Sequence, residues 1–71
     1  MIDYSYWVRI AQCESPGNGK WGVDWKYKKN GREGAFRVRS GTWDTWRIHG
    51  YPRSANRASW YQQMNVVARI A

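Results

Sequence analysis

The chain has 71 residues, which excludes more than one ordinary domain, and its twelve Lys and Arg against five Asp and Glu give a net charge of +7. Its single cysteine excludes an internal disulfide, and one cysteine with one histidine excludes a conventional zinc site, so we expect no metal and no cofactor. No apolar run approaches the roughly 20 residues that span a bilayer, and no secretory signal follows the first methionine, so we expect no membrane partner.

Basic and aromatic side chains dominate the composition. A basic protein is attracted to polyanions, which leaves nucleic acid, an anionic surface or an acidic wall polymer as partners. Six Trp, five Tyr and one Phe make up 17% of the residues. Each large ring buries roughly 150–250 Å², so in a chain this short these rings are expected to fill the core. Aromatic faces are also typical of sugar-binding clefts.

The first predicted element is a helix from Asp3 to Ser15. Asp3 or Ser5 can cap its start, and the Ser-Pro-Gly-Asn-Gly segment at 15–19 stops it. One helical face is formed by the residues at positions i, i+3, i+4 and i+7, namely Trp7, Ile10, Ala11 and Glu14.

Glu14 continues the apolar face of this helix at its last turn. A carboxyl group held against apolar neighbours loses hydration, which favours its protonated form, and a carboxyl that stays protonated can act as a general acid. In the alternative, the apolar stripe ends one residue early and Glu14 is exposed. The periodicity does not separate the two interpretations.

The next predicted element is a β-hairpin of Lys20–Lys29 against Arg32–Arg39. Apolar and polar residues alternate along both segments, and the Asn-Gly pair at 30–31 favours a type I′ turn. Val23 and Trp25 should then face the core and Asp24 should face solvent, which argues against a second catalytic carboxylate opposite Glu14. The outward face of the hairpin is basic and contains Lys26, Lys28, Arg37 and Arg39.

Two further helices are predicted after the hairpin. A short one begins at Ser40, with Trp43 and Trp46 on one side, and ends at Gly50. The last begins near Ser59, which can form a capping box with the glutamine three residues later. Its predicted buried stripe consists of Trp60, Met64, Val67, Ala68 and Ala71. The order of elements predicts an α+β fold, with helices around a short antiparallel β-hairpin in one domain over 1–71.

Three segments resemble the catalytic domains of resuscitation-promoting factors, which are transglycosylase-like members of the lysozyme superfamily from actinobacteria and their phages. Residues 7–15 read W-V-R-I-A-Q-C-E-S, and residues 30–43 read N-G-R-E-G-A-F-R-V-R-S-G-T-W. The closing segment has Ala58-Ser59, Gln63 and Val66-Val67-Ala68 at the spacing of the family's last helix. The segments follow the family's order and cover most of the chain.

The resemblance implies an enzyme with a single catalytic carboxylate. The glutamate of C-E-S is Glu14, which is then the catalytic acid, and the threonine of T-W is Thr42, which then lines the substrate cleft. We expect Phe36, Arg37 and Trp43 to contact the substrate beside it. The bond cleaved is the β-1,4 bond between N-acetylmuramic acid and N-acetylglucosamine in peptidoglycan. Either the 6-hydroxyl of the sugar or water can be the nucleophile.

The chain departs from the family pattern in its charge and at its end. Arg37 stands where the family commonly has Gln, and Arg39 where some members have an acidic residue. This added charge favours an anionic wall polymer, or weakens Glu14 as an acid. The chain also lacks the family's last segment with its second cysteine, so the resemblance implies either a fragment or a domain shortened at its C-terminus, with Cys13 unpaired.

Two other functions stay open from the sequence. A fold of this kind with a compromised acid would hold wall glycans without cutting them. A basic, aromatic chain could also bind single-stranded nucleic acid by base stacking, although it has no known motif for this. We expect a monomer that reaches peptidoglycan glycan strands in the cell wall or outside the cell, exported by other means or delivered by a phage.

Overall fold

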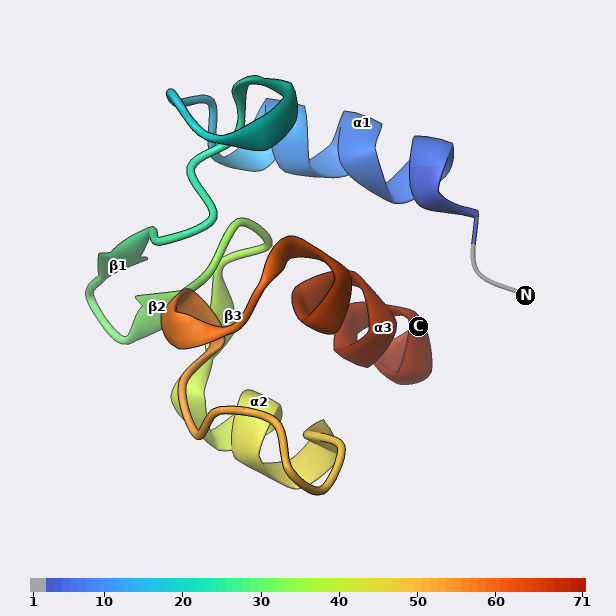
Figure 1. Ribbon diagram of the computed structural model, residues 1–71. Helices are drawn as coiled ribbons and strands as arrows, with labels where there is room; N and C mark the ends of the chain where they lie inside the picture. Colours follow the sequence, from blue (N-terminus) through green and yellow to red (C-terminus); the bar gives the residue numbers. More distant parts are fainter. Residues whose placement is uncertain (1–2) are drawn as a thin grey trace.

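The computed structural model describes residues 3–71, so the first two residues of the predicted domain lie outside it. The predicted α+β class is confirmed: helices surround a small antiparallel sheet (Figure 1). The helices are α1 (Tyr4–Glu14), α2 (Ser40–Trp46) and α3 (Trp60–Ile70), and the strands are β1 (Lys28–Lys29), β2 (Arg32–Glu33) and β3 (Val38–Arg39). Two short 3₁₀ turns, η1 (Lys20–Gly22) and η2 (Ala55–Arg57), complete the described elements.

The helix starts are the best predicted parts of the fold. Asp3, rather than Ser5, caps α1: its carboxylate accepts a hydrogen bond from the backbone N–H of Tyr6 at 3.3 Å. The capping box of α3 is confirmed, because Ser59 Oγ and the Gln62 side chain each accept the other residue's backbone N–H. Both signals act within four residues, so they hold whatever the rest of the chain does.

The sheet has three strands in the order β1-β2-β3, not the two of the predicted hairpin. The Asn30-Gly31 turn between β1 and β2 is confirmed, with φ of 53° and 77°. The chain then turns again after β2, where Gly34 and Arg37 have φ of 76° and 52° and the Arg37 N–H donates to the Gly34 carbonyl at 3.1 Å. This second turn divides the predicted strand 32–39 into β2 and β3.

The first half of the predicted hairpin is also mostly not a strand. Residues 20–22 form η1, in which Trp21 and Gly22 have φ of 60° and 69°, and this left-handed backbone is incompatible with a strand. The side chains of Val23 and Trp25 nevertheless point into the core, as the alternation predicted.

Helix α2 ends at Trp46, four residues before the predicted stop at Gly50. Arg47 takes an extended backbone with ψ of 137°, and its guanidinium donates to the Tyr51 carbonyl at 3.0 Å. Ile48 is then free to pack against the core. Trp46, predicted to share the buried side of the helix, is 40% exposed.

The core consists of two clusters on either side of α3. The first is built from α1, the loop before the sheet and the turn after β2, and contains Ala11, Val23, Trp25, Ala35 and Met64. The second lies against α2 and η2 and contains Trp43, Ala55, Ala58 and Val66. Because α3 faces both clusters, its buried residues are Gln63, Met64 and Val66, so the buried face is rotated from the predicted stripe. Met64 is the one member of that stripe that is buried, whereas Trp60, Val67 and Ala68 are half-buried and Ala71 is exposed.

Aromatic rings link the elements around the first cluster. Successive edge-to-face contacts, with ring centroids 4.9–6.4 Å apart, run through Tyr6, Trp7, Phe36, Trp25, Trp21, Trp60 and Tyr61. The chain of rings connects α1, the loop before the sheet, the turn after β2 and α3. Most of the aromatic excess therefore serves packing.

Gln63 hydrogen-bonds to three distant parts of the backbone from inside the core. Its Oε1 accepts from the Ala35 N–H at 2.8 Å, and its Nε2 donates to the carbonyls of Trp25 at 2.7 Å and Ala58 at 3.0 Å. The side chain is 1% exposed, so no water can replace these bonds without rearrangement. One amide thus fixes the loop before the sheet, the turn after β2 and the start of α3 relative to one another.

Gln63→Met should lower the free energy of unfolding by at least about 3 kcal/mol. The substitution nearly conserves volume but leaves three buried backbone groups without partners, at about 1–3 kcal/mol each. Urea denaturation followed by tryptophan fluorescence measures the loss. Gln62→Met is the matched control and should cost only about 1 kcal/mol, since it removes one capping bond. Equal losses in the two variants would contradict the assigned role of Gln63.

Gly34→Ala should destabilise the fold by about 2 kcal/mol or more. A Cβ at Gly34 would lie 2.7 Å from Gln63 Oε1, and the φ of 76° strains any residue with a side chain. Gly41→Ala is the control: Gly41 is helical, its Cβ would meet nothing within 4 Å, and the change should stabilise α2 by up to about 1 kcal/mol. Thermal unfolding of both variants tests the contrast, and a neutral Gly34→Ala would refute it.

Candidate active site

Glu14 is the last residue of α1, and its side chain is exposed. The apolar enclosure that the helical stripe predicted is therefore absent, and the alternative with an exposed glutamate is the observed one. Glu14 still shares a face of α1 with Trp7, since seven residues make nearly two helical turns. The centroids of the Trp7 and Phe36 rings are 5.9 Å apart, so this face of α1 meets the turn after β2.

The C-terminal end of α1, where Glu14 lies, is on the side of the molecule that holds the sheet (Figure 1). Among residues 3–71, an ion pair forms between Asp44 and Arg47 and none involves Glu14. The carboxylate is thus open to solvent and not engaged by a fixed cation. The Glu14 carboxyl group can donate a proton to, or accept a proton from, a molecule bound beside α1 and the sheet.

The loop after α1 pairs the backbone of Asp24 with Ser15, the residue that follows Glu14. The Asp24 N–H donates to the Ser15 carbonyl at 2.7 Å, which joins the segment before the sheet to the end of α1. Asp24 was predicted to face solvent, but it is half-buried. Its carboxylate accepts from the Lys26 N–H at 3.1 Å, so one of its oxygens stabilises this loop.

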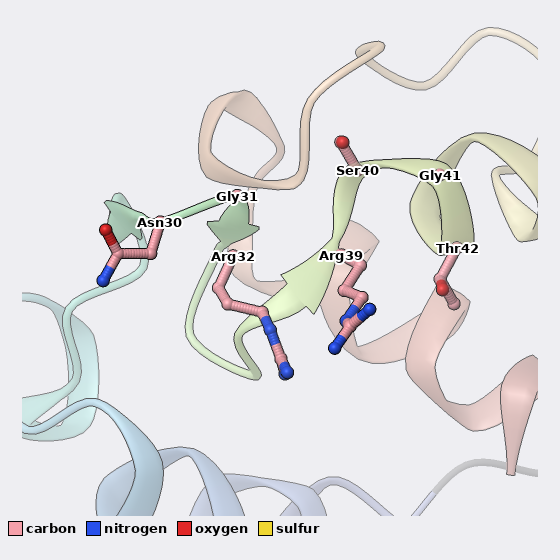
Figure 2. A pocket seen from close by; sticks show the side chains of 7 residues that line it. All are labelled: Asn30, Gly31, Arg32, Arg39, Ser40, Gly41 and Thr42. Carbon is pink, nitrogen blue, oxygen red and sulfur yellow. The ribbon is translucent and has the colours of Figure 1, made fainter.

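A hollow of about 810 Å³ opens beside the sheet. It is lined by Asn30, Gly31, Arg32, Arg39, Ser40, Gly41 and Thr42. Figure 2 shows the side chains of Arg32, Arg39 and Thr42 pointing to the same side, toward which α1 lies in this view, while Ser40 points away. Thr42, which the resemblance assigned to the cleft, therefore lines a real depression together with two arginines.

The other predicted contact residues have different surroundings. Phe36 is half-buried and packs against the first core cluster, with one edge toward Trp7. Arg37 is exposed, and its guanidinium lies 4.7 Å from the centre of the Tyr27 ring. Its φ of 52° costs a residue with a side chain about 1–2 kcal/mol, a strain that proteins tend to keep at functional sites.

Trp43 was expected to contact the substrate, and the structure instead buries it completely. Its indole fills the second core cluster, and its Nε1–H donates to the Pro52 carbonyl at 2.9 Å. The tryptophan that follows Thr42 therefore stabilises α2 against the core, and positions Thr42 without reaching the hollow.

Arg32 and Glu33 are two site-region residues that the sequence reasoning missed. Arg32 lines the hollow, whereas Glu33, the next residue in β2, is 6% exposed and points to the opposite side of the sheet. Glu33 Oε1 has no hydrogen-bond partner. The strand alternation could have separated the two residues if the short strand β2 had been recognised.

Within residues 3–71, no group of three or more His, Cys, Asp or Glu lies together as a metal site would require. No described helix is long and apolar enough to cross a membrane. Cys13 is a free, exposed cysteine.

Comparison with known proteins gives one family match. The model of the transglycosylase-like domain family matches residues 2–71, which is nearly the whole chain. Neither curated proteins nor solved structures gave a match.

Proposed function

Because the chain belongs to the family of transglycosylase-like domains, we propose that it cleaves the β-1,4 bond between N-acetylmuramic acid and N-acetylglucosamine, with Glu14 as its catalytic acid. Family membership supports a peptidoglycan-acting enzyme in general. The observation that carries the finer proposal is the position of Glu14. It is an exposed, unpaired carboxylate at the end of α1, on the helix face that meets the turn after β2.

The proposed reaction uses Glu14 twice. The protonated carboxyl donates its proton to the glycosidic oxygen as the bond from the anomeric carbon to that oxygen breaks. The 6-hydroxyl of the same muramic acid residue then attacks the anomeric carbon, and its proton returns to the Glu14 carboxylate. The products are a 1,6-anhydro end and a free hydroxyl on the leaving sugar. A substrate seated against α1 would supply the water exclusion that the free protein lacks.

The intramolecular nucleophile is favoured over a second protein carboxylate. Asp24 is joined to the end of α1 by the bond from its N–H to the Ser15 carbonyl, and its carboxylate already accepts the Lys26 N–H. A transglycosylase needs no nucleophilic carboxylate, since the sugar provides the attacking oxygen. Water in place of the 6-hydroxyl would make the same site a hydrolase.

A wall-binding module is the second candidate, and the exposure of Glu14 favours it. A general acid is most effective when its surroundings are dry, and Glu14 is exposed in the part of the chain that the structure describes. The hollow with Thr42 and two arginines would still bind a glycan strand. Cleavage of the strand distinguishes the two candidates.

Glu14→Gln should lower the rate of peptidoglycan cleavage by about 10²–10⁴-fold, because it removes the proton donor while conserving shape. Purified peptidoglycan is digested with each variant, and the soluble products are identified by mass spectrometry. Anhydro-muropeptides are expected from the wild type. Asp44→Asn is the matched control, since Asp44 is an exposed carboxylate on α2, and it should keep wild-type activity.

Asp24→Asn completes the experiment. It should also stay active, since the amide oxygen can still accept the Lys26 N–H and the proposed mechanism needs no second carboxylate. If Asp24→Asn is inactive and the wild type releases products with reducing ends, the protein is a hydrolase that uses two carboxylates. If no variant releases products while all of them bind the wall, the binding module is the correct function.

A further inference from the structure

Arg32 and Arg39 form a cross-strand pair of like charges. They lie directly opposite each other on the antiparallel strands β2 and β3. Like charges in this position destabilise a sheet. Within residues 3–71 neither arginine has an ion pair, although an acidic neighbour would relieve the repulsion. The two guanidinium groups therefore repel each other at the edge of the hollow, and this repulsion destabilises the sheet.

The two guanidinium groups converge on one space. Both side chains point to the same side of the sheet as Thr42 (Figure 2), and all three residues line the hollow of about 810 Å³. Arg32 Nη1 donates to the Arg37 carbonyl at 3.4 Å, which holds the Arg32 side chain along the turn after β2. Most of the N–H donors of the pair are left open toward the hollow.

A third cation lies in the turn after β2, outside the lining of the hollow. Arg37 is exposed in the same turn, stacked on Tyr27 and held with a left-handed backbone. Among the described residues, no Asp or Glu lines the hollow. Planar guanidinium forks match the two oxygens of a carboxylate or the oxygens of a phosphate, and they bind such groups more specifically than a lysine does.

We propose that this hollow binds the carboxylate borne by the muramic acid residues of a glycan strand. The inference rests on the proposed function and names the part of the substrate that the basic face recognises. The backbone of such a strand is built from uncharged N-acetylated sugars, whereas each muramic acid has a lactyl carboxyl or the peptide attached to it. Arg32 and Arg39 hold the oxyanion, and the Thr42 hydroxyl bonds to a neighbouring polar group of the sugar.

The test measures binding separately from cleavage. In a Glu14→Gln background, which cannot cut the ligand, affinity is measured at about 0.15 M salt for three ligands. These are peptide-free glycan strands, which have the lactyl carboxylate, peptide-bearing strands, which have peptide carboxylates, and chitohexaose, which is neutral. Arg32→Gln with Arg39→Gln should weaken binding of the preferred anionic strand about tenfold or more and leave chitohexaose binding unchanged. The strand that loses affinity identifies the source of the carboxylate.

Two further variants separate recognition from charge. Arg9→Gln with Arg53→Gln removes the same two charges from exposed positions outside the hollow, from +7 to +5 in the otherwise native chain, and should weaken binding less than threefold. Arg32→Lys with Arg39→Lys keeps the charge and should lose part of the affinity, because an ammonium cannot bind an oxyanion through two parallel N–H groups.

The outcomes distinguish this inference from the proposed function. The proposed site would be wrong if Arg32→Gln with Arg39→Gln and Arg9→Gln with Arg53→Gln lost equal affinity for the anionic strand. It would also be wrong if the protein bound poly(glycerol phosphate) tightly and that binding depended on no particular arginine. A native chain that cleaves peptidoglycan but binds neutral and anionic strands equally would overturn the inference alone. A chain that never cleaves but loses anionic strands only when Arg32 and Arg39 are changed would overturn the proposed cleavage alone.

Discussion

The buried amide of Gln63 is the interaction on which the rest of the structure depends. Each core cluster is small, and neither alone would hold the short strands in place. The amide supplies one acceptor and two donated bonds to backbone groups that no regular ladder satisfies. It thereby fixes the turn after β2, which places Phe36 against α1 and directs Arg32 into the hollow. The geometry of the candidate site is therefore set partly by α3, through a buried side chain that does not line the hollow.

The features of the fold that were predicted from the sequence are local ones. Helix caps and the Asn30-Gly31 turn depend on residues within a few positions of each other, so their signals survive in any context. The features that were missed depend on distant partners. Gln63 is polar at the centre of a buried face, and its partners Ala35 and Trp25 lie 28 and 38 residues away in the chain. The left-handed backbone of Arg37 has no local signal, since arginine has no preference for that conformation.

The candidate site divides in the same way. The resemblance to a known family assigned Glu14 and Thr42 to the site. Thr42 lines the hollow, and Glu14 is the last residue of α1. Periodicity could not decide whether Glu14 is enclosed, because enclosure depends on what packs against the last turn of α1. Trp43 was assigned to the substrate by its nearness to Thr42 in sequence, but successive helical residues point in different directions, and the larger ring occupies the core. Arg32 was missed because its pairing with Arg39 on β3 depends on the turn after β2, which the sequence pattern did not predict.

The sheet described here has short, charged edges, and this has a consequence for self-association. Each edge strand has two residues: β1 consists of Lys28 and Lys29, and β3 includes Arg39. An exposed strand edge can template pairing with another chain, and brevity and lysine charge are two ways in which proteins prevent it. A second copy that approached in register would bring like charges together on a ladder too short to compensate. A chain this rich in aromatic residues is thereby protected from aggregation through its backbone, even when its concentration rises at a solid polymer surface.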